Sequence, residues 1–337
     1  MEDKIQYFIV KLNDNGMRLD RWLSQQFPNI NNSIAQKLIR TGEIKLNKKK
    51  VEFNSRVSNG DEVRVPVFIV NNIDINKNKA NKKQSIDINA YKKQIEDLKK
   101  NILYKDDDYI ILNKPSGLSV QGGSGVVFSL TDALESLRFG LDYNPYIVHR
   151  IDKETSGILI LARTRESSIH MLDLFKNKLI EKNYLAIVYP VLNAELSGVI
   201  DAPLFKDLSL ENQKVEVSEE GKDAITNYNI LNLKNNVALI NFSPQTGRTH
   251  QIRVHTNYFF KASILGDYKY NFNKHSFLNI LKKNFKFKDN LINEIDLRKM
   301  YLHAHKVKFK SQHGVIIDII CPIPNYFQAI TDIIFKN

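Results

Sequence analysis

The chain has 337 residues, and this length predicts two domains, at least one of which buries a full hydrophobic core without disulfides or metals. Its single cysteine, Cys321, excludes an internal disulfide, and because no Cys/His cluster has zinc-site spacing, the composition indicates a reducing, cytoplasmic location. The formal net charge of +12 is densest in the first third of the chain, where it fits a polyanionic partner and a general lysine-rich bias equally well.

The first part of the chain, residues 1–70, predicts a compact domain of two helices followed by a hairpin. From residue 16 to 27, apolar side chains recur at spacings of three and four, which predicts an amphipathic helix. Ser33 is the expected N-cap of a second helix, and Gly42 is expected to take the left-handed conformation that ends it. Between residues 44 and 65 the apolar period becomes two, which predicts the hairpin.

The middle and last parts differ sharply in composition. Residues 71–100 are rich in Asn, Lys, Asp and Gln and predict a mobile basic linker, with room for a short helix near its end. Residues 101–337 alternate between strand and helix patterns, which predicts an α+β domain with a mixed or antiparallel sheet. The expected strands are 109–112, 157–162, 184–189, 237–242 and 315–320, and the expected helices are 129–138 and 167–179.

Two polar clusters are candidates for chemistry, and each lies next to an expected strand. The first, His149–Gly157, contains Asp152, and the second, Thr246–His255, contains Arg248. A guanidinium near an aspartate keeps the carboxylate ionised and fixes its orientation. A purely structural ion pair between Asp152 and Arg248, with the histidines in ordinary hydrogen bonds, explains the same pattern and stays open on these residues alone.

Several functional classes are disfavoured. The two clusters offer no second well-placed carboxylate to act with Asp152, which disfavours a glycosidase or nucleosidase. The motifs of serine hydrolases, P-loop proteins and dinucleotide-binding proteins are absent, and the glycines of 122–125 predict a tight turn. Residues 1–4 lack the layout of a signal peptide, and apolar runs such as 315–320 are too short to cross a bilayer.

The first cluster resembles the signature of a known enzyme family. Residues 149–157 read His-Arg-Ile-Asp-Lys-Glu-Thr-Ser-Gly, and the RluA-type pseudouridine synthases carry His-Arg-Leu-Asp-x-x-Thr-Ser-Gly, so Ile151 is the one departure. Further blocks that resemble this family follow its order: 113–117, 182–186, 246–255, 264–267 and 302–304. Residues 18–23 and 33–49 are similar to an S4 domain, a small RNA-binding module.

The resemblance implies that the protein isomerises uridine to pseudouridine, with no cofactor and no metal. Asp152 is then the catalytic carboxylate that acts at ribose C1′ of a uridine flipped out of the RNA. Arg248 is expected to pair with Asp152, and Lys114 to support the active-site loop rather than to touch RNA. The implied substrate-binding residues are Tyr184, which would stack on the base, Arg150, which would enter the gap that the base leaves, Ile252 in the pocket wall, Arg248 and His149.

The resemblance also implies an RNA partner. In the S4-like domain, the side chains expected to contact phosphates are Arg18, Lys37, Arg40, Lys45 and Lys48. The segments 121–125 and 220–228 are most similar to the family members that modify RNA of the bacterial large ribosomal subunit. This resemblance implies 23S ribosomal RNA or its precursor as the partner, and we expect the protein to be a monomer. Transfer RNA, other ribosomal sites and a non-catalytic RNA-binding role in ribosome assembly are the alternatives, and the insertion 271–300 has no functional interpretation.

Overall fold

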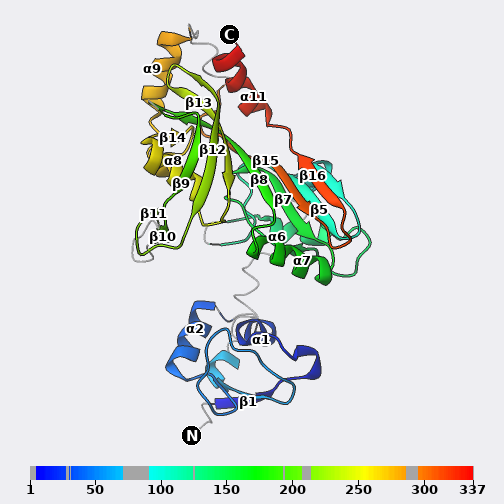
Figure 1. The fold of residues 1–337 in the computed structure, drawn as a ribbon. Coiled ribbons are helices and arrows are strands. Elements are labelled where there is room, and N and C mark those ends of the chain that lie inside the picture. The colour runs from blue at the N-terminus through cyan, green and yellow to red at the C-terminus, as the bar shows by residue number, and fades with distance from the viewer. Residues whose placement is uncertain are drawn as a thin grey trace. The chain divides into compact units, whose positions relative to one another are not determined.

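The computed structural model of the protein describes residues 5–27, 30, 32–70, 91–123, 126–192, 194–206, 214–285 and 295–336. The chain divides into two compact units, Met1–Asn89 and Ala90–Asn337 (Figure 1). Residues 71–90 of the predicted linker lie outside the described residues. No helix in the described part of the chain is both long enough and apolar enough to span a membrane.

In its described part, the first unit contains the helices α1 and α2 and a three-stranded antiparallel sheet of order β1-β3-β2. Buried Trp22 and Leu23 are part of its core, where the helices pack against the sheet. The second helix ends at Gly42, which takes the expected left-handed conformation, but it starts at Asn32, so Ser33 lies inside the first turn and is not the cap. The elements are β1 (Ile5–Ile9), η1 (Leu12–Asp14), α1 (Leu19–Gln26), α2 (Asn32–Thr41), β2 (Lys45–Leu46) and β3 (Glu62–Pro66).

The second unit begins earlier than the sequence predicted. Helix α5 (Lys92–Lys100) buries Ile95 and Leu98 against the sheet of this unit, together with Ile110 and Leu161. The boundary at residue 100 was therefore wrong by about ten residues, because two apolar side chains three positions apart attach a mostly charged helix to the core. The prediction of a short helix at this place is confirmed.

The described part of the second unit contains one mixed sheet of 11 strands, as expected for an α+β domain. Its main path runs β4-β5-β7-β15-β8-β13-β12-β9. Strands β15 and β7 pair in parallel, whereas the other neighbours of β15 pair with it antiparallel. The strands are β4 (Ile102–Lys105), β5 (Tyr109–Lys114), β6 (Tyr146–Ile147), β7 (Ser156–Ala162), β8 (Glu181–Tyr189), β9 (Ser197–Asp201), β12 (Ile225–Lys234), β13 (Val237–Pro244), β14 (Ser263–Ile264), β15 (Leu302–Lys310) and β16 (Ile316–Ile320), with β10 (Leu204–Lys206) and β11 (Val215–Val217) as a separate pair.

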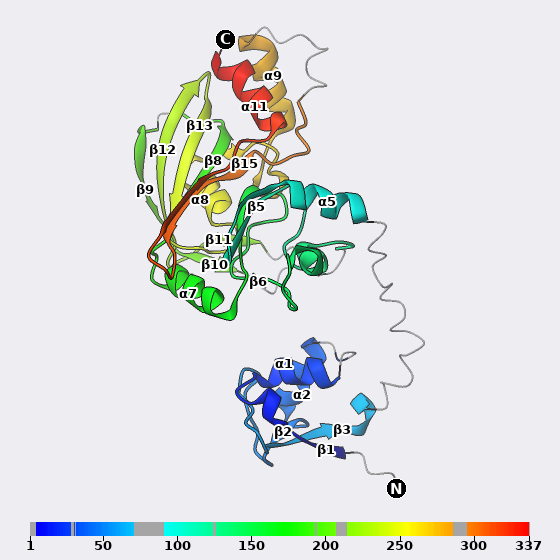
Figure 2. The same cartoon turned by 90° about the vertical axis from the view of Figure 1, so that its right-hand side faces the viewer.

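Helices cover both faces of this sheet, which explains why several strands are apolar throughout (Figure 2). In β5, Tyr109 and Ile111 face α7, whereas Ile110 and Leu112 face α5 and α6. The expected helix 129–138 is split into α6 and a 3-10 turn. The helices are α6 (Leu130–Ala133), η3 (Leu134–Leu137), α7 (Arg165–Lys176), α8 (Gln251–Phe260), η4 (Tyr268–Tyr270), α9 (Lys274–Asn284), α11 (Asn325–Thr331) and the π-helical turn η5 (Asp332–Lys336).

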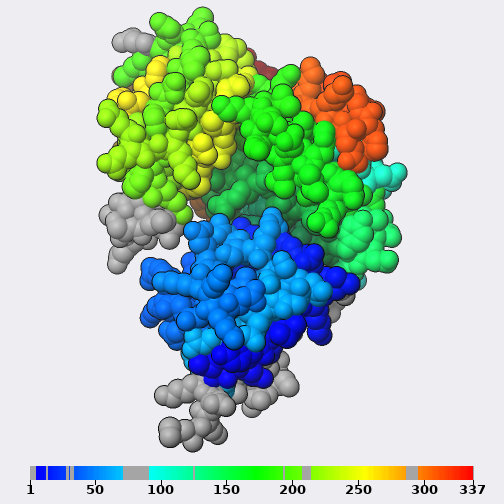
Figure 3. Space-filling model, turned by 60° about the horizontal axis from the view of Figure 1, so that its bottom comes forward, coloured from blue at the N-terminus to red at the C-terminus, as the bar shows by residue number. Residues whose placement is uncertain are grey.

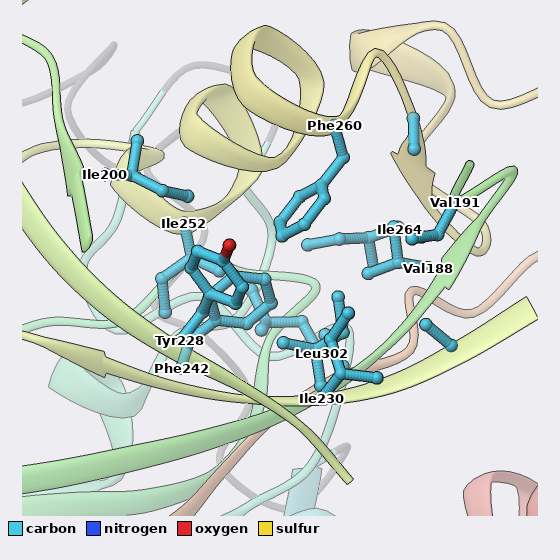
Figure 4. Close-up of a cluster of buried hydrophobic side chains, with 14 of the residues drawn as sticks. Val188, Val191, Ile200, Tyr228, Ile230, Phe242, Ile252, Phe260, Ile264 and Leu302 are labelled. Carbon is cyan, nitrogen blue, oxygen red and sulfur yellow. The ribbon is translucent and has the colours of Figure 1, made fainter. Parts of the chain in front are cut away.

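Two apolar clusters position the C-terminal half of this unit. Helix α8 packs on β8, β12 and β13, and its Ile252 and Phe260 insert among Phe242, Ile264 and Val188 (Figure 4). On the other face of β8, the described part of the insertion 271–300 packs against the C-terminal helix. The insertion therefore contributes core residues, which its pattern of Lys, Asn and Phe did not reveal.

Candidate active site

Asp152 lies in the loop between β6 and β7. The buried ammonium of Lys114 links this loop to the segment after β5 through backbone carbonyl oxygens. Lys114 Nζ donates hydrogen bonds to the carbonyl oxygens of Pro115 (2.9 Å), Leu118 (2.9 Å) and Lys153 (3.0 Å). All three of its donors are thus used by backbone, because a buried ammonium needs a partner for each N–H. Lys114 therefore supports the loop that contains Asp152, as expected.

Gly157, at the start of β7, is a position where only glycine fits. Its φ is +101°, and a Cβ atom there would overlap the backbone carbonyl of Ala304 on β15. We expect Gly157→Ala to destabilise the protein by about 3 kcal/mol or more, because both the backbone conformation and the strand contact oppose a side chain. Urea unfolding measures the loss, and Gly123→Ala, which meets open space at an ordinary φ, is the matched control. Equal stability of the two variants would contradict this prediction.

The partner of Asp152 is Arg253, in the first turn of α8, and not Arg248. Arg253 Nη1 donates to Asp152 Oδ2 at 3.0 Å. Arg248 is exposed, and its Nε donates to the carbonyl oxygen of Asp223 at 3.0 Å. The sequence-based pairing of Asp152 with Arg248 was therefore wrong, because α8 starts at Gln251 and its first turn presents the later arginine to the loop that contains Asp152.

A buried aspartate fixes the guanidinium of Arg253. Asp267, after β14, accepts from Arg253 Nε and Nη2, both at 2.7 Å, so the fork is bidentate. Burial opposes the charge of Arg253, but the two carboxylates outweigh it and raise the pKa of its guanidinium. Sequence reasoning gave Asp267 no role, since a partner 14 residues away leaves no local pattern. Among the described residues, the Asp152 carboxylate forms hydrogen bonds through Oδ2 only.

His250, the residue before α8, is a second neighbour of Asp152 that sequence reasoning did not select. Its Nε2 lies 3.9 Å from Asp152 Oδ2, and its Nδ1 lies 2.8 Å from the hydroxyl of Tyr270. The Tyr270 ring also lies under the Arg253 guanidinium, whose central carbon is 5.0 Å from the ring centroid. Burial lowers the pKa of His250 to about 4, so the imidazole is neutral near pH 7.

Asp152, His250 and Arg253 line a pocket of about 530 Å³, a size typical of ligand sites. Its mouth is seen as a hollow in the surface between green and yellow-green segments in Figure 3. Tyr184 of β8 lies inside, and burial together with the charge of Asp152 raises its pKa to about 12. Arg150 is exposed, whereas Ile252 is only 6% exposed and belongs to both the pocket wall and the core. The predicted residues that line the pocket are His149, Arg150, Asp152, Tyr184, Arg248 and Ile252.

His149 lines the pocket but is bound to the backbone. Its Nε2 accepts the amide proton of Ile160 at 2.8 Å, and its ring lies against Phe175. Burial, with a smaller effect of Lys182, lowers the pKa of His149 to about 3, which keeps Nε2 available as an acceptor. This hydrogen bond fixes the segment that leads into the loop of Asp152.

The five predicted cations of the first unit do not form one cluster. Arg18 is paired with Asp20 at 2.8 Å, whereas Lys37 and Arg40 are exposed on α2. The side chains of Lys45 and Lys50 approach Gly42 at the end of α2, where Arg64 Nη1 lies 3.5 Å from the Gly42 carbonyl oxygen. Lys48 is exposed in the turn after β2. Lys50 and Arg64 were not among the predicted cations. Arg64 reaches the end of α2 because β3 pairs with β2.

The described ranges contain no group of three or more His, Cys, Asp and Glu side chains arranged to hold a metal ion. The arrangement at the pocket is instead one oriented carboxylate beside an aromatic ring, a guanidinium and a neutral imidazole. Such a site offers a nucleophile or base and a stacking surface to a planar ligand.

Comparisons with known proteins agree with this geometry. A family model described as RNA pseudouridylate synthase matches residues 108–258, and an S4 domain model matches residues 17–63. A ribosomal large subunit pseudouridine synthase C from Haemophilus ducreyi is 34% identical over 91% of this chain and 88% of its own length. The same-named protein of Buchnera aphidicola is 34% identical over 94% of both chains. The structure of human RNA pseudouridylate synthase domain containing 4 covers 71% of this chain and 95% of its own, with a TM-score of 0.58 and 26% identity.

Proposed function

The chain belongs to the RNA pseudouridylate synthase family, and we propose that it isomerises uridines of 23S ribosomal RNA, with Asp152 as the catalytic carboxylate. The substrate is supported by the relatives named as large-subunit synthases. The single observation that carries the catalytic role is the position of Asp152: it lies in a ligand-sized pocket, and Arg253 binds only one of its two oxygens.

The reaction needs a single carboxylate. The bond between ribose C1′ and uracil N1 breaks, and a bond from C1′ to C5 forms. C5 loses a proton and N1 gains one, so the reaction involves no net oxidation. A carboxylate beside the ribose attacks C1′, stabilises its positive charge or takes a ribose proton. Arg253 keeps Asp152 ionised and holds it in one orientation.

The remaining pocket residues are suited to hold a uridine that has left the RNA helix. Extrusion of a base costs a few kcal/mol of stacking, which a new stacking partner offsets. We assign the stacking role to Tyr184 and the apolar wall to Ile252, both of which line the pocket. Arg150, exposed beside the loop, would fill the gap in the RNA, and exposed Arg248 would contact a phosphate.

The S4-like domain, which we place in residues 1–70, would position the RNA without reading its sequence. Arg40, Lys45 and Lys48 are available for phosphates, while Arg18 must first leave Asp20. Lys37 offers a further exposed charge on α2. We expect the protein to act as a monomer in the cytoplasm, without a cofactor.

Pseudouridine mapping of 23S RNA from cells that lack this protein tests the proposed function. We expect one or a few sites to lose pseudouridine and to regain it when the wild-type chain is supplied. Loss at transfer RNA sites instead would move the substrate to another RNA. Unchanged maps for all RNAs would favour the non-catalytic role in ribosome assembly.

A further inference from the structure

His250 is held in an unusual conformation beside the catalytic carboxylate. Its φ is +56°, in the left-handed region, and it precedes the first residue of α8. Few residues other than glycine adopt this region, and asparagine does so more readily than most. The conformation directs the imidazole toward the pocket, where it lies between Asp152 and Tyr270.

Tyr270 determines which ring nitrogen of His250 carries the proton. The Tyr270 hydroxyl lies 2.8 Å from His250 Nδ1, and its oxygen accepts the amide proton of Val215 at 3.4 Å. Tyr270 is buried, so its own hydroxyl proton needs an acceptor, and Nδ1 is the acceptor within reach. The neutral imidazole therefore carries its proton on Nε2.

The Nε2–H group is left available beside Asp152. Its distance of 3.9 Å from Asp152 Oδ2 is too long for a hydrogen bond, and no other partner of Nε2 is found among the described residues. Arg253, another donor next to Asp152, is committed to Asp152 and Asp267. A ligand oxygen close to the catalytic carboxylate would therefore meet the Nε2–H group of His250 as an unused donor.

The proposed reaction requires such a donor. When the C1′–N1 bond breaks and its electron pair stays on the base, the detached uracil carries one negative charge, shared between its ring and its two carbonyl oxygens. The nearby Asp152 carboxylate repels this charge. A neutral donor stabilises the anion without protonating Asp152, in the manner of an oxyanion hole.

We propose that His250 is a further catalytic residue, whose Nε2–H donates a hydrogen bond to a carbonyl oxygen of the detached uracil, and that Tyr270 is the positioning residue that fixes its tautomer. The inference rests on the proposed function. His250 transfers no proton in this role, so the isomerisation stays balanced.

Two substitutions of His250 separate catalysis from structure. His250→Gln carries an amide N–H near the former Nε2 position, whereas His250→Asn reaches only the position of Nδ1. In single-turnover assays at saturating RNA, we expect Asn to slow conversion by about 100-fold and Gln by less than about 10-fold, with the RNA Kd unchanged. If position 250 mattered only for its left-handed backbone conformation, Asn would be the milder change, because asparagine adopts that conformation readily.

Tyr270→Phe supplies a second readout, since it keeps the ring under Arg253 and removes only the hydroxyl. We expect a slowing of roughly fivefold in the otherwise wild-type protein, because one hydrogen bond is lost. In the His250→Asn protein we expect no further slowing, since the tautomer no longer matters there. Additive effects, or a reversed order of Gln and Asn, would overturn the inference.

A wild-type chain that converts no uridine in any RNA would instead overturn the proposed function, and with it this inference.

Discussion

Asp152→Asn is expected to abolish pseudouridine formation, with a loss of at least about 10⁴-fold in the single-turnover rate, while RNA binding persists. The amide is nearly isosteric but supplies neither a nucleophile nor a base, and it cannot stabilise positive charge at C1′. Arg253 keeps Asp267 as its bidentate partner, so the fold has no reason to fail. The affinity should change little, because most of it comes from phosphate contacts.

Pseudouridine in purified 23S RNA and binding of the same RNA are measured in parallel. Glu154→Gln is the matched control, because it makes the same chemical change two positions along the same loop. Glu154 does not line the pocket, and the Ser116 hydroxyl donates to its backbone carbonyl oxygen and not to its carboxylate, so the control should keep nearly full activity. An Asp152→Asn protein with more than about one per cent of the wild-type rate would refute the catalytic assignment.

Two of the strands that the sequence predicted are buried on both faces, whereas Ile316 and Ile320 of the predicted strand β16 are exposed. Tyr109–Leu112 and Tyr184–Tyr189 are apolar runs because helices cover both sides of β5 and β8. Strand β12 was missed because its exposed face carries asparagines such as Asn229, which are rare in strands, and a bulge follows Ile230. Strand β1 was missed as well, since its burial does not alternate and its pairing with β3 is set by tertiary contacts.

Without the family resemblance, the site was predictable only where its residues are contiguous in sequence. The segment 149–157 presents Asp152 by itself, because Lys114 and Gly157 hold one loop in place. The partner of Asp152 is 101 residues away, and the choice between Arg248 and Arg253 depends on where α8 begins. No periodicity encodes a left-handed residue before a helix, so that start could not be inferred from the pattern.

Comparison of Arg253→Lys with Arg248→Lys tests which arginine serves the catalytic carboxylate. Lysine keeps the positive charge in both variants but loses the planar fork. At position 253 the ammonium cannot bind both oxygens of Asp267 and also reach Asp152, so the carboxylate loses its fixed orientation. We expect kcat to fall by about 100-fold at saturating RNA, and the free energy of unfolding to fall by about 2–4 kcal/mol.

At position 248 the same change affects an exposed side chain that donates a hydrogen bond to the backbone carbonyl oxygen of Asp223. We therefore expect kcat to stay within about twofold of wild type and the free energy of unfolding to stay nearly unchanged. The affinity for RNA should at most weaken, because a lysine still neutralises a phosphate. The two arginines thus separate catalytic orientation from RNA binding. A larger loss of kcat in Arg248→Lys than in Arg253→Lys would restore the sequence-based pairing and would mean that the loop rearranges when RNA binds.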